Sequence, residues 1–301
     1  MISEAKSRMI NLTVFRQEDP DLRNIKTEEI KRNIKEMCIE ANHILSPDMK
    51  DVFERAVQEE NSPLGKRILG QLEENLIIAE EEMIPICQDT GMAVIFMEVG
   101  QEVHIEGGSL TEAVNQGVRE GYTEGFLRKS VVADPLERIN TKDNTPAIIH
   151  YNIVEGGGIR ITVAPKGFGS ENMSRVFMLK PADGIEGVKE AVLTAVKDAG
   201  PNACPPMVVG VGIGGTFEKC ALMAKHALTR NLKEESPIPY VRDLEKELLE
   251  KINALGIGPG GLGGKVTALA VNIETYPTHI AGLPVAVNIC CHVNRHVHRV
   301  I

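Results

Sequence analysis

Apolar residues recur at helical spacing through the first eighty or so positions of the chain. Two Ser-Pro pairs, at residues 46–47 and 62–63, each place a hydroxyl that can cap a helix before a proline that suits the first helical turn. The apolar positions behind these pairs share one helical face, and they are Val52, Phe53, Ala56, Val57, Leu64, Ile68, Leu69, Leu72 and Leu76. We therefore predict a helical N-terminal part, residues 1–80.

From residue 81 onward the pattern changes to short apolar runs separated by glycine turns. The clearest strand predictions are residues 93–99, 147–153, 159–163 and 207–211. Helices are predicted at residues 110–122, 187–198, 217–228 and 241–255, with Gly256 as a left-handed cap after the last. The predicted fold is mixed α/β, in which the helical N-terminal part packs on a mixed-sheet domain of residues 81–301. No repeat or flexible linker divides the chain.

Composition and charge narrow the function classes. The chain has 301 residues, a net charge of −9 and no long basic run, so a nucleic-acid partner is not expected. The first eight residues carry charges where a signal peptide needs an apolar stretch, and no run approaches the length of a membrane span. We expect a cytoplasmic protein without a membrane partner. Its six cysteines are then expected to be reduced or bound to metal.

Three of the six cysteines lie in turn-like contexts, far apart in the sequence. They are Cys87 in Pro-Ile-Cys-Gln-Asp-Thr-Gly, Cys204 in Asn-Ala-Cys-Pro-Pro, and Cys291 in Asn-Ile-Cys-Cys-His. If the fold gathers them, three thiolates leave one iron of a four-iron cluster open, and an open iron is a Lewis acid. The alternative is that each thiol packs as a small apolar group, which is our interpretation of Cys38 and Cys220.

Glycine motifs offer weaker alternatives. Residues 210–215 fit the G-x-G-x-x-G pattern, but the acidic strand end needed about twenty positions later is missing. Residues 260–265 lack the first glycine and the hydroxyl of a phosphate loop. Residues 166–172, Lys-Gly-Phe-Gly-Ser-Glu-Asn, are the best candidate for close approach to a small anion, although a plain turn is equally favoured. A zinc site around Cys291 and His292 lacks the usual ligand spacing.

Four of these motifs together resemble the iron–sulfur hydro-lyases. They are residues 86–91, 166–172, 202–206 and 208–216, and the resemblance extends over nearly the whole chain. The similarity is to the alpha subunit of two-subunit class I fumarate hydratase, with the alpha subunit of L(+)-tartrate dehydratase as a close sibling. It implies that residues 81–301 form an iron–sulfur domain.

The resemblance also implies a set of site residues. A [4Fe–4S] cluster would be held by Cys87, Cys204 and Cys291. The last is preferred to its neighbour Cys290 because the family places a ligand seven positions after the proline that opens the last strand, here Pro284.

Substrate and catalytic roles follow from the same resemblance. Contacts to a dicarboxylate are implied at Gln88, Asp89, Arg128 and Gly169, and catalytic roles at His279 and Asp89. The forked guanidinium of Arg128 suits a carboxylate. An aspartate hydrogen-bonded to a histidine would set the tautomer of its ring.

The implied activity is reversible hydration of fumarate to (S)-malate. L(+)-tartrate dehydration is the first alternative, a non-catalytic iron–sulfur sensor the second, and an oxidoreductase that binds NAD a further one. Single-chain relatives continue into a second catalytic domain, whereas this chain stops soon after Cys291. We therefore expect a separate beta subunit that supplies further cationic groups and the base, in an assembly of two alpha and two beta subunits.

Overall fold

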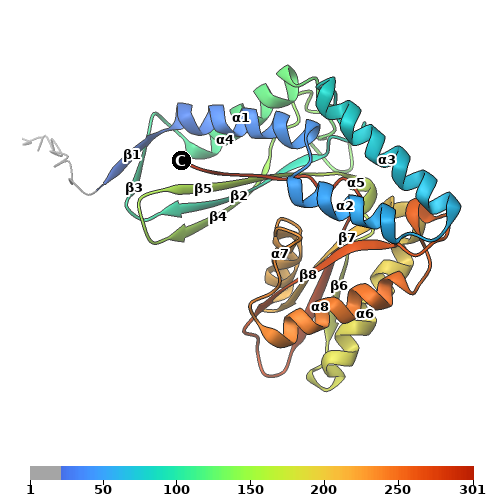
Figure 1. Cartoon of the computed structure of the whole chain (residues 1–301). Coiled ribbons are helices and arrows are strands. Elements are labelled where there is room, and N and C mark those ends of the chain that lie inside the picture. The colour runs from blue at the N-terminus through green and yellow to red at the C-terminus, as the bar shows by residue number, and fades with distance from the viewer. Residues whose placement is uncertain (1–21) are drawn as a thin grey trace, which may run out of the picture.

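The computed structural model describes residues 22–301 (Figure 1). The prediction about the first eight residues lies outside this range. None of the helices described is long and apolar enough to cross a membrane. Two four-stranded sheets, each flanked by helices, make up most of the fold (Figure 1). The predicted mixed α/β class is confirmed.

The first sheet has the strand order β10-β5-β2-β4. These strands are β2 (Met92–Gly100), β4 (Ile148–Val154), β5 (Ile159–Lys166) and β10 (Val297–Val300). β5 runs antiparallel to both β2 and β10, and β4 runs parallel to β2. Helices α1 (Thr27–His43) and α4 (Leu110–Glu124) pack against each other and cover one face (Figure 1). A short parallel pair, β1 (Arg23–Lys26) and β3 (Val103–Glu106), extends this part.

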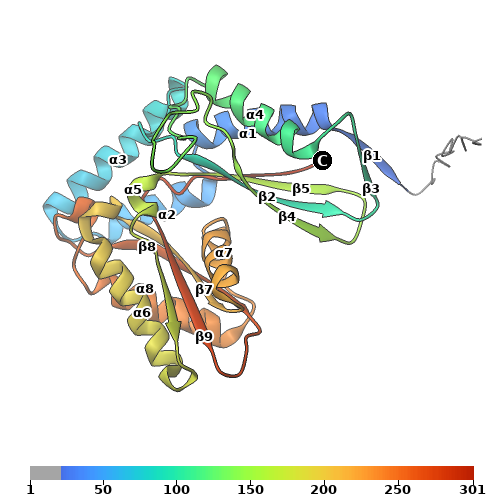
Figure 2. The ribbon, with the colours of Figure 1, turned by 180° about the vertical axis from the view of Figure 1, so that it is seen from behind.

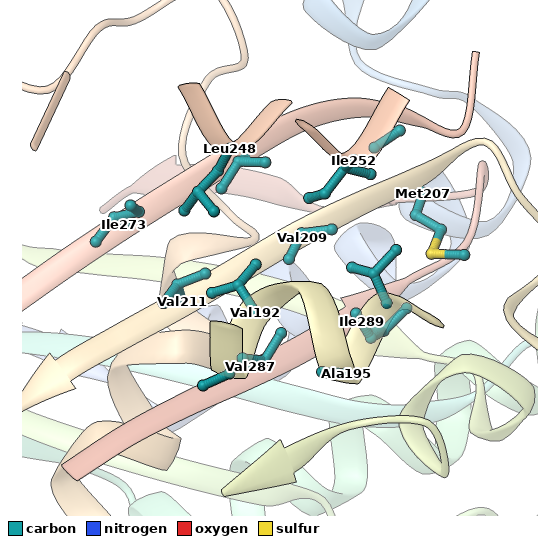
Figure 3. Close-up of a cluster of buried hydrophobic side chains, with 14 of the residues drawn as sticks. Val192, Ala195, Met207, Val209, Val211, Leu248, Ile252, Ile273, Val287 and Ile289 are labelled. Atoms are coloured by element: carbon teal, nitrogen blue, oxygen red, sulfur yellow. The ribbon is translucent and has the colours of Figure 1, made fainter. Parts of the chain in front are cut away.

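The second sheet has the order β6-β9-β7-β8. These strands are β6 (Arg175–Leu179), β7 (Met207–Gly214), β8 (Ala268–Tyr276) and β9 (Leu283–Cys290). β9 runs antiparallel to β6 and β7, and β8 runs parallel to β7. One face packs on α6 (Gly184–Ala199) and α8 (Pro239–Asn253), where Val209, Val287 and Ile252 belong to a fully apolar core (Figure 3). The transfer of these aliphatic side chains from water stabilises the layer pair.

Helix α7 (Phe217–Ala227) covers the opposite face of the second sheet and lies between the two sheets (Figure 2). Near the end of this helix, His226 meets the Phe96 ring of the first sheet edge to face, with 5.0 Å between ring centroids. Gly210 and Gly212 of β7 allow the helix to come close, because a Cβ at either would lie 2.1 Å from a carbonyl oxygen of α7. The G-x-G-x-x-G pattern thus lies within a strand and serves helix packing.

Helices α2 (Pro47–Glu59) and α3 (Pro63–Glu81) form a third apolar cluster with one end of the second sheet. Phe53 and Leu69 pack there with Val208 of β7 and Cys290 of β9. Both helices begin at a proline, as predicted. Ser62 caps α3 by accepting a hydrogen bond from the Gly65 amide, whereas the hydroxyl that precedes α2 makes no capping bond.

The N-terminal helices divide between the two sheets and do not form one separate layer that ends at residue 80. α1 shares a core with α4 and the first sheet, while α2 and α3 pack beside the second sheet. The division into residues 1–80 and 81–301 stays a prediction. β9 is not the last strand, because β10 follows it, so that part of the argument for Cys291 was wrong. The remaining short elements are α5 (Phe168–Glu171), η1 (Pro181–Asp183), η2 (Gly200–Ala203) and η3 (Pro259–Gly261).

Candidate active site

The fold brings Cys204 and Cys291 to the same end of the second sheet. Cys291 directly follows β9, and the last residue of β9 pairs with Val208 at the start of β7, just after Cys204. The Cys204 carbonyl accepts hydrogen bonds from the His292 amide (3.4 Å) and from its ring Nδ1 (3.1 Å). Strand pairing therefore places the two thiol-bearing turns side by side.

Cys87 reaches this place from the turn after α3. Its segment is held by the Ile86 amide, which donates to the carbonyl of Asn42, and by Asn75, which donates to the Ile86 carbonyl. Burial raises the pKa of Cys204, and the nearby thiolates of Cys291 and Cys87 raise it further. Cys87 and Cys291 also pack against the same apolar cluster, so the three thiol-bearing turns lie in one region of the fold.

The backbone at Cys204 is unusual. Its φ of 52° puts a residue with a side chain in the left-handed region, where glycine is favoured. The residue ends η2 and its side chain is exposed. A strained conformation kept at an exposed thiol is typical of functional sites.

The neighbouring cysteines differ in burial. Cys290 is only 5% exposed and packs in the core cluster beneath α2 and α3, whereas Cys291 is half-buried like Cys87. Cys38 and Cys220 are fully buried, as expected of packing residues. The difference between the neighbours supports Cys291 as the ligand, although the choice stays a prediction.

The donor set fits a cluster better than a single ion. In residues 22–301, no group of three His, Cys, Asp or Glu side chains is arranged to hold one metal ion. Three thiolates on separate turns suit three corners of a four-iron cluster, whose irons are spread over a larger volume. The zinc alternative around His292 gains no support from this arrangement.

Asp89 fastens the Cys87 turn to the loop at residues 166–172. Its Oδ1 accepts from the Gly91 amide (3.0 Å) and its Oδ2 from the Phe168 amide (2.8 Å). A Cβ at Gly91 would lie 2.6 Å from the Lys166 carbonyl carbon, so only glycine permits this approach. The Asp89 amide lies 3.4 Å from Cys87 Sγ, which ties the carboxylate to the thiol.

A cleft of about 490 Å³ opens beside Asp89. Arg128 lines it, and the backbone of Arg128 is fixed by the Thr90 hydroxyl, which accepts from its amide (2.9 Å) and donates to its carbonyl (3.2 Å). Phe168 and Asn172 also line this cleft. The structure therefore places the predicted carboxylate clamp and Asp89 around one cavity.

Arg138 lines the same cleft and was missed by the sequence analysis. Its φ of 63° is again in the left-handed region, and its amide donates to the carbonyl of Asp134. Among the described residues, none of the ion pairs involves its guanidinium. The positive φ of a residue other than glycine is invisible in a single sequence.

Gly169 and Gln88 keep positions that suit ligand contact. A Cβ at Gly169 would meet nothing within 4 Å, so open space lies beside this backbone. Gln88 is exposed, and its Oε1 lies 3.5 Å from the Cys87 thiol. Their predicted substrate contacts stay predictions.

The fold of this chain does not place His279 near the three thiols. It is exposed in the turn between β8 and β9, where its Nδ1 accepts from the Ala281 amide (3.1 Å). β9 has eight residues, so at a rise of about 3.3 Å per residue the turn lies about 23 Å from Cys290. The expected hydrogen bond from Asp89 to a histidine is absent among the described residues, where the carboxylate is held by backbone amides instead. The catalytic role of His279 stays a prediction.

The glycine loop at residues 260–265 lies against a side chain of the protein itself. The Glu60 carboxylate, 1% exposed, accepts from the amides of Asn61, Ser62, Lys265 and Val266 at 2.8–2.9 Å. A loop that resembles a phosphate loop therefore binds an internal carboxylate. The amides of Lys265 and Val266 are therefore already engaged and are not free to bind a phosphate.

Comparison with known proteins decides the family. The family model for fumarate hydratase (Fumerase) matches residues 31–300. This chain belongs to the fumarate hydratase family. The match includes Cys87, Cys204 and Cys291, all of which the fold has gathered at one end of the second sheet.

Two relatives of this chain have names that refer to L(+)-tartrate and not to fumarate. A protein of Methanocaldococcus jannaschii, provisionally named L(+)-tartrate dehydratase subunit alpha, is 44% identical over 266 residues, covering 86% of this chain and 93% of that protein. L(+)-tartrate dehydratase subunit alpha of Escherichia coli (strain K12) is 32% identical over 252 residues, covering 82% of each. The resemblance inferred from the motifs is confirmed at the level of the family.

Proposed function

We propose that this chain is the cluster-binding alpha subunit of a hydro-lyase that adds water to, or removes it from, a four-carbon dicarboxylate. The observation that carries the proposal is that three thiol-bearing turns from distant segments gather in one region, near a cleft lined by Arg128. A hydro-lyase needs this combination, because it must bind carboxylates and also assist the departure of a hydroxyl group. Membership of the fumarate hydratase family supports the same reaction class.

Cys87, Cys204 and Cys291 would hold a [4Fe–4S] cluster. When bound, such a cluster supplies Lewis-acid chemistry at an iron that no protein thiolate covers. The half-buried and exposed positions of these three thiols suit a cluster that faces a substrate cleft.

The residues of this chain would bind and orient the substrate. Arg128 and Arg138 offer two planar cationic forks to carboxylates in the cleft. Phe168 adds an apolar side chain to the lining of the cleft. Asp89, held at both carboxylate oxygens, keeps the cleft wall and the Cys87 turn in one geometry. Preorganised cationic donors of this kind stabilise negative charge that develops on a substrate carboxylate.

A beta subunit would close the cleft. The relatives are named as alpha subunits, which supports a partner chain. Exposed apolar side chains flank the cleft arginines in sequence: Phe126 and Leu136 are each 89% exposed and Ile139 is 62% exposed. Large apolar groups left in water near a half-open site are typical of an interface. We expect two alpha and two beta subunits in the cytoplasm, on the strength of the family resemblance.

Fumarate and L(+)-tartrate are the two candidate substrates. The fumarate hydratase family favours malate and fumarate, while the names of the relatives favour tartrate. A non-catalytic sensor is less well supported, because a sensor has no need of two arginines in a cleft beside the thiols. The NAD alternative is disfavoured because Gly210 and Gly212 are covered by α7.

The test is anaerobic co-production with a candidate beta subunit, followed by assays of dehydration with (S)-malate and with L(+)-tartrate. We expect turnover of one of the two, and a four-iron cluster by iron and sulfide analysis. A chain that contains stoichiometric zinc without sulfide, or a cluster-loaded complex that turns over neither acid, would contradict the proposal.

A further inference from the structure

A group of buried and half-buried cationic side chains lies beside Cys290, the last residue of β9. Lys166 and Arg295 are 6% and 5% exposed, and the side chain of Lys225 is 20% exposed. Together with Cys290 these three cations line a cavity of about 20 Å³, which is room for about one water molecule. They come from β5, α7 and the segment after β9, so the folded chain assembles them.

Two carboxylates face this group. Glu171 forms an ion pair with Lys225 and lies 3.5 Å from the Lys166 ammonium, and it also accepts a hydrogen bond from Asn288 (3.1 Å). Asp89 lies close to Arg295, which donates to the Asp89 carbonyl. Counted over lysine, arginine, aspartate and glutamate side chains, this group therefore has three cations and two carboxylates, an excess of one positive charge.

Arg295 is incompletely paired. Its Nε donates to the Pro165 carbonyl (3.3 Å) and its Nη2 to that of Asp89, but its Nη1 has no partner among the described residues. The buried His296 Nδ1, on the same cavity, also lacks one. Unpaired buried donors are costly, so a positive charge retained here calls for negative charge nearby.

We propose that Lys166, Lys225 and Arg295 form a cationic wall that offsets the negative charge of the cluster and its thiolates, and that the wall sets the reduction potential of the cluster. This inference rests on the proposed function. The negative charge of three thiolates exceeds the positive charge of a resting four-iron core by one. This excess matches the excess of one positive charge among the side chains of the cationic group. The potential of a cluster depends on the net charge around it, so each cation of the wall should raise it.

Lys225 offers the cleanest test, because it is neither a predicted ligand nor part of the cleft. The Lys225→Met variant keeps the length of the apolar stem and removes the charge. In the anaerobic complex with the beta subunit, we expect its cluster to have a more negative midpoint potential than wild type in a redox titration followed by electron paramagnetic resonance. Lys225→Arg, which keeps the charge, should retain the wild-type potential.

Lys189→Met is the matched control. The Lys189 side chain is 12% exposed and pairs with Glu186 and Glu247 on the helices that cover the opposite face of the second sheet. Its loss should leave the potential unchanged. If Lys225→Met disturbs folding, as judged by thermal melting, Lys166→Gln is measured in its place with the same expected direction.

The outcomes separate this inference from the function. A wild-type complex that binds no cluster overturns the proposed function and the wall together. A fully loaded cluster whose potential is the same in wild type and in Lys225→Met overturns the wall alone. Equal shifts in the Met and Arg variants would also overturn it, because they would show a packing effect and not an effect of charge.

Discussion

The carboxylate of Asp89 accepts a hydrogen bond of 2.8 Å from the backbone amide of Phe168, a residue 79 positions away in the sequence. The second carboxylate oxygen is engaged by the Gly91 amide. Both oxygens of this side chain therefore hold backbone in place, and the turn that carries Cys87 cannot move independently of the loop that lines the cleft. Asp89 therefore has a structural role, because it connects two loops irrespective of any contact with substrate.

Replacement of Asp89 by asparagine should loosen this connection. An amide can accept from one backbone donor but presents its own N–H to the other, so we expect a loss of about 2 kcal/mol in the free energy of unfolding and faster loss of iron. Thermal melting and iron release to a chelator measure the two effects. Asp134→Asn is the control, since Asp134 also accepts from two backbone amides but lies in an exposed turn. Equal losses of stability and equal rates of iron release in both variants would contradict this structural role of Asp89.

Removal of either cleft arginine should weaken substrate use and spare the cluster. For Arg128→Met we expect kcat/KM to fall about 100-fold, and for Arg138→Met about 10-fold, mainly through KM, because each loses a charged fork for a carboxylate. Steady-state kinetics with malate and tartrate provide the measurement. Arg160→Met, at an exposed pair with Glu98 on the first sheet, should match wild type. Normal kinetics in Arg138→Met would remove that residue from the site.

Cysteine replacements should fall into two groups. Serine at Cys87, Cys204 or Cys291 should abolish the cluster, whereas serine at Cys38 or Cys220, both fully buried, should retain it at a cost of about 1–3 kcal/mol in stability. Sulfide analysis and thermal melting distinguish the groups.

Cys290→Ser decides between the two neighbouring thiols. Because Cys290 is buried in the core, we expect this variant to be less stable but still able to bind the cluster. Loss of the cluster in Cys290→Ser, together with its retention in Cys291→Ser, would reverse the ligand choice.

Two glycines should respond in opposite ways to alanine. A Cβ at Gly210 would collide with the Ala224 carbonyl at 2.1 Å, so Gly210→Ala should destabilise the protein by about 3 kcal/mol. Gly169 has open space beside it, so Gly169→Ala should keep its melting temperature while substrate binding weakens. Melting curves and KM values are the measurements. A drop in stability for Gly169→Ala without any change in KM would contradict the predicted ligand contact.

Glu60 should make the free energy of unfolding depend on pH in the acid range. Burial alone would raise the pKa of its carboxyl, but the hydrogen bonds donated by the backbone amides, foremost that of Lys265, outweigh this and hold the pKa below its ordinary value. A lowered folded-state pKa gives stability that is present above about pH 4.5 and is lost as the pH falls through the folded value. Glu60→Gln should therefore lower stability at pH 7 and flatten its pH dependence below pH 4.5. Glu59→Gln, at an exposed neighbour, should leave both unchanged; a wild-type profile in Glu60→Gln would contradict the assignment.

The sequence predicted local structure and reactive residue types better than their assembly. Apolar spacing found α3 and α4 and the strands β2 and β5 to within a few residues, because each buries a regular face. It missed β8 and β10, although both lie in sheets, since a strand is defined by partners that are far away in the sequence. Turn residues around Cys87 and Cys204 indicated turn-like contexts for these thiols, and in the structure the Cys204 side chain is exposed while that of Cys87 is half-buried.

Other parts of the site could not be deduced without coordinates. The guanidinium of Arg138 joins Arg128 in one cleft only because of a loop with a positive φ. The hydrogen bonds that Arg295 donates to the carbonyls of Pro165 and Asp89 depend on a contact between segments that are distant in the sequence. For His279 the resemblance implies a catalytic role, whereas the length of β9 places the residue at the far end of the second sheet, so this role stays a prediction.

The position of β9 has a consequence for how the protein matures. This strand is inserted between β6 and β7, although β6 and β7 both precede it in the chain. Until it inserts, the second sheet lacks an interior strand and Cys291 has no fixed position relative to Cys204. The turns of Cys204 and Cys291 therefore meet only after pairing between strands that are distant in the sequence, which is slow by nature. In the proposed function, only chains that have completed this sheet would be able to hold the cluster with all three thiols.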